Sequence, residues 1–282
     1  MIKKLISLIF SLALFCSFSN CFALTNSIVA ESPEWTNVMQ IKSEAPDSTG
    51  DTTPGYCNAT LINHNVLITA AHCVKLAYIS GMKKIDIQIG YYKYITRKTD
   101  GKLVRIGYVA KYNLTKNVNV ELPRSLIDKI SHSGEKSTID PTEDVALIWW
   151  NEETPEMADI QVADIVSPAE HNSLIKNISQ TTLQAVTVNP FSEMSLDTKR
   201  IATLNNFKWS GYVYSKSQSR VEVGDSGAPL FAKINGKFKI LAVVKGKAST
   251  VFDNWDAYAG VNPHLCQMAE LLPTFIKIEA CK

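Results

Sequence analysis

The alternation of apolar and polar residues along the chain predicts a protein built from short β-strands. Runs rich in β-branched and other apolar residues recur between polar turns, and the pair Asn235-Gly236 before the last of them is a strong β-hairpin signal. The runs cover residues 60–62, 66–69, 85–89, 145–150, 183–188 and 238–244. Many short strands with frequent turns indicate a sandwich or a barrel, so we expect an all-β protein of one or two barrels.

Helical periodicity is present in one stretch near the C-terminus. Between His264 and Ile276, four apolar residues fall on one helical face, namely Leu265, Met268, Leu271 and Leu272. Pro273 weakens the second half of this pattern, because proline removes a backbone donor and clashes with the preceding turn. We therefore expect a single helix, at the C-terminal end of the fold.

The first 23 residues have the layout of a secretory signal peptide. Two lysines precede the apolar run 5–18, and small residues at positions 21 and 23 fit a cleavage site after Ala23. A membrane anchor is the alternative, but the run is short for a spanning helix, which needs about 20 residues. Lipid attachment at Cys16 or Cys21 is disfavoured by the bulky Phe15 and by Asn20. We expect residues 1–23 to be removed, leaving a protein without a membrane anchor that is secreted, or periplasmic in a Gram-negative bacterium.

The charge balance narrows the range of partners. The formal net charge is +2, with both signs distributed throughout the chain. Such a balance argues against nucleic acid as a partner and gives no information about a substrate.

Four cysteines remain after the signal peptide is removed: Cys57, Cys73, Cys266 and Cys281. An even number in an exported chain suggests two disulfides, for which three connectivities are possible. The spacing favours the local pairs Cys57–Cys73 and Cys266–Cys281, each closing a loop worth about 3 kcal/mol. The rival interpretation is a zinc site with the ligands Cys57, His64, His72 and Cys73. Its spacing matches no common zinc finger.

Three segments carry residue types that suit nucleophilic catalysis. Residues 57–73 form an apolar strand that ends in Ala70-Ala71-His72-Cys73, where small side chains allow close packing around the histidine. Asp144 directly precedes the apolar run 145–150, with Glu143 and Asp140 as competing acids. Ser226 lies in the turn Gly224-Asp225-Ser226-Gly227. Each segment by itself more often has a structural role.

The combination of these residue types has a chemical rationale. A histidine can act as general base for a serine hydroxyl when the two lie within hydrogen-bond reach. A buried carboxylate can accept the Nδ1–H of that histidine and stabilise the imidazolium. Glycines beside the serine allow a sharp turn whose amides, those of Gly224 and Ser226, would stabilise an oxyanion.

Together, the three segments resemble the chymotrypsin/trypsin family of serine endopeptidases, in which the order along the chain is His, Asp, Ser. The resemblance implies two six-stranded antiparallel β-barrels followed by a C-terminal helix. It implies an N-terminal barrel over residues 28–158 with His72 and Asp144, and a C-terminal barrel over residues 159–282 with Ser226. These three residues would form the catalytic triad, with Gly224 and Ser226 as the oxyanion hole.

The pair Ile28-Val29 resembles the start of active enzymes in this family. The resemblance implies that residues 24–27 form a pro-segment of a zymogen, and that a free Ile28 ammonium pairs with Asp225. The alternative is that Ile28-Val29 is merely the beginning of a strand.

The specificity pocket departs from the family pattern. Alignment with the family places Arg220 at the base of the pocket, Lys245-Gly246-Lys247 on the substrate-binding strand, and Asp256 at a further position that faces the pocket. Arg220 could pair with Asp256 and close the pocket, or it could combine with a lysine to favour acidic side chains. Alternatively, a free Asp256 could attract Lys or Arg. Lys245 could also pair with Asp144.

The sequence therefore predicts an exported serine endopeptidase that hydrolyses proteins or peptides through an acyl-enzyme. No metal or organic cofactor is implied, and we expect a monomer that protein inhibitors could also bind. The alternative is a binding protein on a protease scaffold, with its pocket blocked by Arg220 and Lys245. A third hypothesis, an esterase, would use the same groups.

Overall fold

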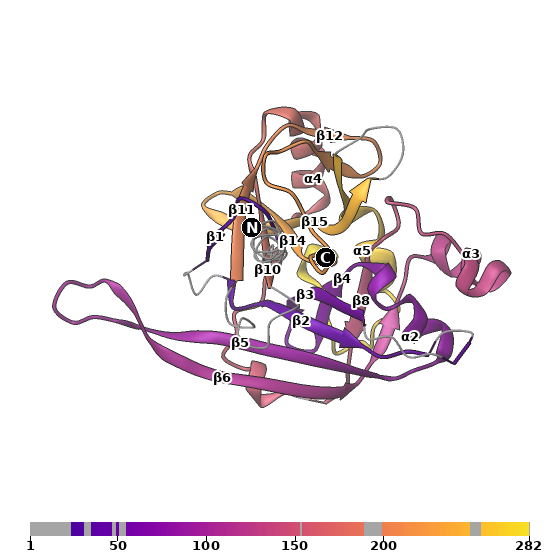
Figure 1. Ribbon diagram of the computed structural model, residues 1–282, viewed down its shortest axis with the longest axis horizontal. Coiled ribbons are helices and arrows are strands. Elements are labelled where there is room, and N and C mark those ends of the chain that lie inside the picture. Colours follow the sequence, from indigo (N-terminus) through magenta and orange to yellow (C-terminus); the bar gives the residue numbers. More distant parts are fainter. Residues whose placement is uncertain are drawn as a thin grey trace, which may run out of the picture.

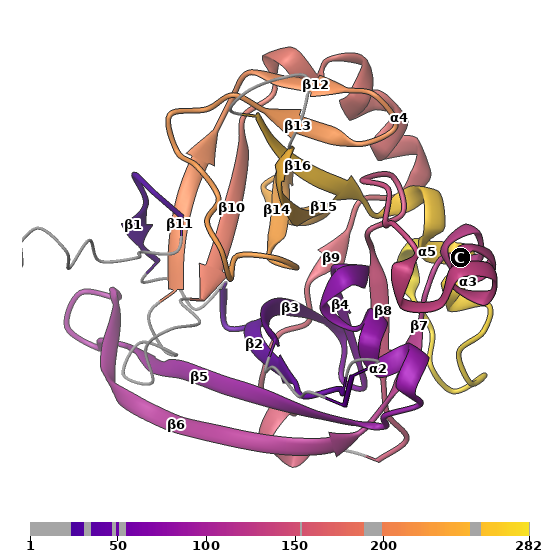
Figure 2. The same ribbon diagram turned by 45° about the vertical axis from the view of Figure 1, so that its right-hand side comes forward.

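The computed structural model describes residues 24–30, 35–46, 49–50, 55–152, 154–188, 199–248 and 255–281, with side chains apart from those of residues 88–95, 103–113 and 248. Its strands form two antiparallel sheets that lie one above the other in Figures 1 and 2. Each sheet draws its strands mainly from one half of the chain.

The first sheet contains seven strands in the order β6-β5-β2-β3-β4-β8-β7. They are β2 (Val38–Ser43), β3 (Gly55–Asn63), β4 (Val66–Thr69), β5 (Lys84–Thr96), β6 (Leu103–Asn117), β7 (Asn119–Glu121) and β8 (Ala146–Trp149). The predicted strands at 60–62, 66–69, 85–89 and 145–150 all fall in this sheet.

The second sheet contains nine strands in the order β1-β11-β10-β14-β15-β16-β13-β12, with β9 paired in parallel to β15. They are β1 (Ile28–Val29), β9 (Asp164–Ile165), β10 (Leu183–Val188), β11 (Lys199–Leu204), β12 (Phe207–Trp209), β13 (Val213–Ser215), β14 (Pro229–Ile234), β15 (Lys237–Ala248) and β16 (Trp255–Gly260). Asn235 and Gly236 both have positive φ and form the predicted hairpin turn between β14 and β15.

The predicted architecture is confirmed: two curled antiparallel sheets, one near-closed barrel and one curled half-barrel, with a helix near the C-terminus. The sheets have seven and nine strands in place of the expected six and six. Ile28 and Val29 pair with β11 of the second sheet, although the predicted N-terminal unit 28–158 includes them.

The expectation of a single helix was wrong. The described part of the chain contains four α-helices: α2 (Lys75–Ser80), α3 (Arg124–Ser133), α4 (Pro168–Lys176) and α5 (Asn262–Ala269). None of them is long and apolar enough to cross a membrane. Helix α5 starts two residues before the predicted helix and ends at Ala269, so that Pro273 lies beyond it. Helix α4 begins at a capping box between Ser167 and Glu170, a readable signal for a helix start.

A shared hydrophobic core joins the two sheets. It contains Ile68 and Leu147 of the first sheet and Val243 and Ala259 of the second, all fully buried. Met268 of α5 packs into the same cluster. Each sheet also encloses a cluster of its own. Because one apolar layer is common to both sheets, residues at the facing strand ends are held in fixed relative positions.

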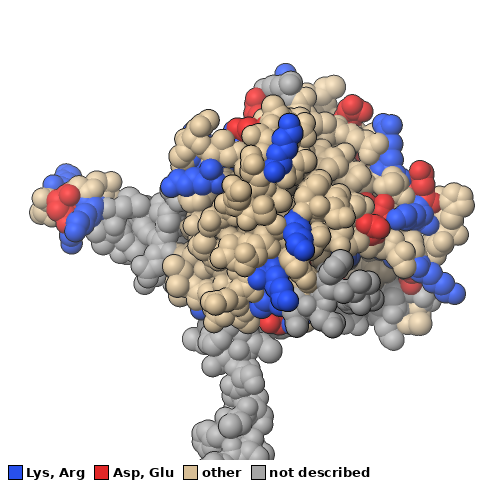
Figure 3. All heavy atoms as spheres, turned by 90° about the horizontal axis from the view of Figure 1, so that it is seen from above, with Lys and Arg blue, Asp and Glu red and all other residues tan. Residues whose placement is uncertain are grey.

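Strands β5 and β6 form a long hairpin that projects from the first sheet (Figure 1). Basic and acidic side chains lie together at the tip of this projection (Figure 3), where Arg97 pairs with Asp100.

Candidate active site

The three residues that the sequence singled out lie at strand ends where the two sheets meet. His72 follows β4, in the short helical turn Ala71–Cys73. Asp144 lies just before β8 and is fully buried. Ser226 belongs to the turn that leads into β14 of the second sheet.

His72 and Asp144 form a close pair. His72 Nδ1 and Asp144 Oδ2 are hydrogen-bonded at 2.8 Å, and the backbone N–H of His72 donates to Asp144 Oδ1 at 2.9 Å. Burial alone would raise the pKa of Asp144, but hydrogen bonds from His72 and the charges of His72 and Lys245 hold it below its usual value. The carboxylate therefore remains ionised and fixes the orientation of the imidazole.

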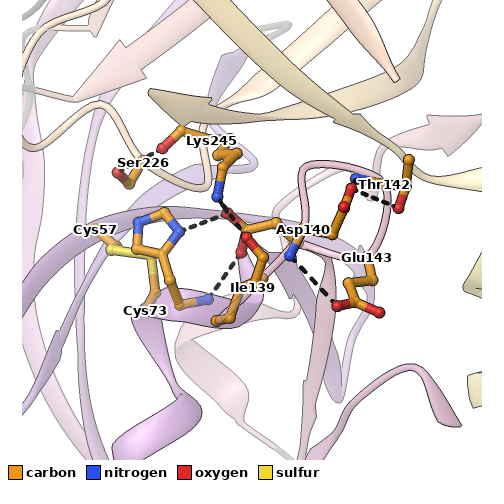
Figure 4. A network of polar contacts seen from close by, with 10 residues as sticks. Cys57, Cys73, Ile139, Asp140, Thr142, Glu143, Ser226 and Lys245 are labelled. Carbon is orange, nitrogen blue, oxygen red and sulfur yellow. Dashed lines mark hydrogen bonds and ion pairs between the residues drawn. A yellow bond between two sulfur atoms is a disulfide. The ribbon is translucent and has the colours of Figure 1, made fainter. Parts of the chain in front are cut away.

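The backbone around His72 is tightly held. Ala70 and Ala71 are fully buried, and a disulfide joins Cys57 of β3 to Cys73 beside the histidine (Figure 4). This pairing and the second one, Cys266–Cys281, are those that the spacing favoured. Because both sulfurs near His72 are in a disulfide, they are not available as thiolates, and the alternative of a zinc site was wrong.

The competing acids near Asp144 have other partners. Glu143 accepts a hydrogen bond from Ser125 Oγ at 2.8 Å and pairs with Lys129. Asp140 accepts from the N–H and the hydroxyl of Thr142 at 2.9 and 2.8 Å (Figure 4). Of the three acids, only Asp144 contacts the histidine.

The turn that carries Ser226 packs closely against the first sheet. Gly227 has φ +78°, and a Cβ there would lie 2.1 Å from the carbonyl oxygen of Asn58 and 2.2 Å from Thr69 Oγ1. Real Cβ contacts do not occur at such distances, so this position requires glycine for space as well as for its backbone angle. The glycine after the serine therefore brings the two halves of the site together.

Asn58 is a site residue that the sequence analysis did not select. It is fully buried in β3, and its backbone N–H donates to the carbonyl oxygen of Ser226 at 2.6 Å. Its side chain donates to the carbonyl of Gly224 at 2.8 Å and accepts from the N–H of Val188 at 2.6 Å. A polar residue inside a strand, between Cys57 and Ala59, was the available signal. Asn58 ties the serine turn to the first sheet.

The amides of Gly224 and Ser226 face no acceptor among the described residues. Gly224 has φ +95°, a backbone angle that favours glycine. The Ser226 hydroxyl donates to the carbonyl oxygen of Lys245 at 3.5 Å (Figure 4). It makes no hydrogen bond to His72 in the part of the chain that the structure covers.

Lys245 lies at a β-bulge of β15, where the pairing with β16 shifts between Val244 and Gly246. A bulge redirects a side chain, and here the Lys245 ammonium donates to Asp144 Oδ2 at 3.3 Å and to the carbonyl of Ile139 at 3.2 Å. Figure 4 shows the lysine reaching across to the loop that precedes Asp144. The carboxylate that holds His72 thus also contacts the ammonium of Lys245.

The residues expected at the pocket base form a closed ion pair. Arg220 donates from Nε and Nη2 to the two oxygens of Asp256, at 3.0 and 2.8 Å. Asp256 is fully buried and also accepts from the N–H of Val221 at 3.2 Å. Burial raises the pKa of Asp256 against the opposing effect of Arg220. The alternative of a free Asp256 does not occur in this structure.

The remaining pocket cation also has a partner. Lys247 pairs with Glu222 at 3.2 Å, and the side chain of Lys247 is exposed. Gly246, with φ +133°, lies between the two lysines. Every lysine and arginine expected in the pocket thus contacts an acid, which also argues against a net positive pocket.

The structure does not bring Ile28 to Asp225. Ile28 is 70% exposed and pairs with Ile201 at the edge of the second sheet. Leu24 is fully buried instead, and its backbone nitrogen donates to Asp225 Oδ2 at 2.9 Å. The predicted pair requires a cut before Ile28, so it stays a prediction; in the uncut chain it is the turn 24–27, and not β1, that reaches Asp225.

The protein-family model described as Trypsin matches residues 26–262, which include His72, Asp144 and Ser226. A search of curated proteins found no match.

Proposed function

Since the chain belongs to the trypsin family, we propose that it is an exported serine endopeptidase that cleaves proteins or peptides through an acyl-enzyme. The observation that carries the proposal is the pairing of His72 with the buried Asp144, opposite a serine turn held by Asn58. A structural histidine would not need a fully buried carboxylate on Nδ1.

The reaction follows from the roles of these groups. The Ser226 hydroxyl leaves the Lys245 carbonyl, donates its proton to Nε2 of His72, and attacks the carbonyl carbon of the substrate. The N–H groups of Gly224 and Ser226 stabilise the resulting oxyanion, and each such donor is worth about 10²–10³ in turnover. His72 then protonates the leaving amine. Water then gives a proton to His72 and attacks the acyl carbon, and the imidazolium returns that proton to Ser226 as the acid leaves. Asp144 stabilises the imidazolium each time it forms.

The pocket residues limit the choice of substrate. Asp256 is occupied by Arg220, so no free carboxylate is available for a Lys or Arg side chain before the scissile bond. The pair is electrically neutral and would partly fill the pocket base at the position that the family resemblance assigns to Arg220. We propose a preference for small or medium uncharged side chains at that position, and weak cleavage after Lys or Arg.

The test is reaction with a fluorophosphonate, followed by intact mass. We expect one adduct on the wild-type protein and none on Ser226→Ala or His72→Ala. A peptide library read by mass spectrometry would then give the cleaved bonds. An unreactive Ser226 in a correctly processed chain would contradict the proposal.

A second candidate function is binding without catalysis. The contact of Lys245 with Asp144 and the closed Arg220–Asp256 pair favour it, because both depart from the family pattern. Such a protein would bind peptides with equal affinity in the wild type and in Ser226→Ala, and would leave them uncut.

A further inference from the structure

We propose that removal of the leader is itself the activating cleavage: the cut after Ala23 frees the Leu24 ammonium, which pairs with Asp225 and orders the oxyanion loop. No pro-segment is then removed, and no separate activating protease is needed. This inference rests on the proposed function, because it concerns how the same site becomes active.

The first step of the argument is the position of Leu24. It is fully buried within the core of the second sheet, in contact with the cluster that contains Val221 and Tyr258. Its φ of +55° is unusual for a leucine and directs the chain inward. A residue that was to be discarded would have no reason to be docked in this way.

The turn that follows Leu24 is also fully integrated. Thr25 exchanges hydrogen bonds with Arg220, from N to O at 2.9 Å and from the Arg220 N–H to Thr25 Oγ1 at 2.9 Å. Asn26 donates to the carbonyl of Gln218 at 2.9 Å and accepts from Ser219 Oγ at 3.2 Å. These contacts fasten the turn to residues 218–220, in the segment that leads to the serine turn.

Ser27 completes the turn. Its hydroxyl bonds to the carbonyl of Leu24, and it accepts from Arg200 Nε at 2.7 Å. The second guanidinium nitrogen of Arg200 donates to the Ser27 carbonyl at 2.7 Å. A cut after Ser27 would remove all of these contacts and leave Ile28 on an edge strand, 70% exposed.

The second step concerns charge. Asp225 is fully buried, and its Oδ2 accepts from the N–H groups of Leu24 and Glu222, at 2.9 and 2.8 Å. Its Oδ1 makes no hydrogen bond of normal geometry among the described residues, although the nearby Thr187 hydroxyl lowers the pKa of the carboxyl. Burial raises the pKa of Asp225 to about 7, so the two amide donors and this hydroxyl do not offset the loss of water. The site lacks a positive charge.

The Leu24 nitrogen supplies that charge once the bond to Ala23 is cut. As an amide it offers one neutral donor, whereas an α-ammonium offers three donors and a full charge at the same position. One N–H can retain Oδ2 while another turns to Oδ1. The carboxylate then remains ionised in the interior, as buried charges require a paired partner.

The third step links this ion pair to the active site. Asp225 is the residue between Gly224 and Ser226, whose amides form the proposed oxyanion hole. Its N–H donates to the Glu222 carbonyl at 3.1 Å, and its carbonyl accepts from Ala228 N–H at 3.0 Å. Fixing the carboxylate therefore fixes the loop on both sides of the serine.

The experiment compares four starting residues in otherwise identical chains: Ala23, Leu24, Thr25 and Ile28. Each is released from a removable fusion by a protease that leaves no residue behind. The fluorophosphonate labelling rate and Tm are recorded for each. We expect the Leu24 start to label at least 100-fold faster than the other three and to melt several degrees higher. Asp225→Asn should remove the advantage of Leu24 over Ala23.

The exported protein provides a direct check. Exported protein that already reacts with the fluorophosphonate should have the intact mass of a chain that begins at Leu24. An Ile28 start that labels as fast as the Leu24 start, or faster, would overturn the inference and restore a four-residue pro-segment. Equal labelling of the Ala23 and Leu24 starts would overturn it too.

The two proposals fail in different ways. If none of the four chains reacts with the fluorophosphonate, but the chain that begins at Leu24 has a higher Tm and loses it in Asp225→Asn, the proposed chemistry fails. The docking of the ammonium then stands. If all starts label equally with equal Tm, the protease proposal stands and the inference falls.

Discussion

The two sides of the candidate site are held by different means. The His72 side is fixed by a disulfide, two buried alanines and a buried carboxylate, all within the first sheet. The Ser226 side depends on contacts from elsewhere: Asn58 of the first sheet, and the turn that begins at Leu24. The groups that brace His72 belong to its own sheet, with Lys245 of the second sheet as a further contact of Asp144, whereas the serine turn depends on distant segments. Substitutions that weaken the support of one side and leave the other side intact test this difference.

The largest expected loss of activity and stability comes from an added side-chain atom at Gly227, where the serine turn packs against the first sheet. Gly227→Ala places a Cβ against Asn58 and Thr69, and we expect about a 1,000-fold loss of kcat/KM and a lower free energy of unfolding by about 4 kcal/mol or more. Gly236→Ala is the matched control, because φ is +82° there and no atom lies within 4 Å of the added Cβ. That variant should lose only about 1 kcal/mol and no activity. Equal losses in the two variants would show that the positive φ angle, and not the packing around the added Cβ, causes the loss.

The pocket ion pair comes next. Arg220→Ser leaves the buried Asp256 with only the Val221 N–H, and we expect a loss of about 3–5 kcal/mol at neutral pH. The double variant Arg220→Ser/Asp256→Asn should recover most of it in urea unfolding. The single variant should also cleave after Lys at least tenfold faster than wild type, and the double variant should not. An unchanged preference would place Asp256 outside the pocket.

Asp225 should give the Ser226 side a pH dependence of its own. In a chain that begins at Ala23, the Leu24 nitrogen is an amide, and burial raises the pKa of Asp225 from 3.8 to about 7. Between these values the unfolded state releases a proton that the folded state retains, so stability falls as pH rises from about 4 to 7, by about 4 kcal/mol. The Leu24 start should avoid this loss.

The measurement is urea unfolding of both forms at pH 4, 5.5 and 7. The difference in free energy of unfolding between the Leu24 and Ala23 starts should widen with pH. A constant difference would mean that Asp225 is ionised, or protonated, in both forms over the whole range.

The two disulfides allow a test of the His72 side. They close loops of nearly equal length, with sequence separations of 16 and 15, so removing either pair by Cys→Ala should reduce stability by about 3 kcal/mol. We expect kcat to fall about tenfold only without Cys57–Cys73, which braces His72. Loss of Cys266–Cys281 should leave kcat unchanged for the folded fraction. Equal kcat values would show that the buried alanines suffice.

The smallest expected effect concerns Lys245. The imidazolium that forms during the reaction lies close to this second cation, because both contact Asp144. We expect Lys245→Met to raise kcat severalfold at low salt, with less change at high salt. A decrease in kcat would instead make Lys245 a residue that positions Asp144.

The sequence was sufficient for features that depend on local chemistry. In the segments around His72, Asp144 and Ser226, the residues that identify each segment lie within a few positions of one another. Both disulfides join cysteines that are close in the sequence. The Asn235-Gly236 turn was predictable because its backbone angles select those residues. The Ser167–Glu170 capping box was equally readable and was overlooked.

Features that depend on tertiary structure could not be predicted from the sequence. Leu24 and Ile28 are both apolar and follow the predicted signal peptide, and only the tertiary structure decides which of them is buried. The direction in which the Lys245 side chain points follows from a β-bulge, and no residue type in the sequence predicts that bulge. Asn58 acts through contacts with residues more than 100 positions away in the chain.

The disulfide beside His72 has a consequence for the cell that makes this protein. Cysteines remain reduced in the cytosol and pair only in oxidising compartments. Under the export that we propose, the chain would lack the covalent brace of its histidine loop before it leaves the cytosol, in addition to carrying the uncut leader. We therefore expect newly made chains to be harmless to the proteins around them, so that self-protection would not require a dedicated inhibitor at the site of synthesis.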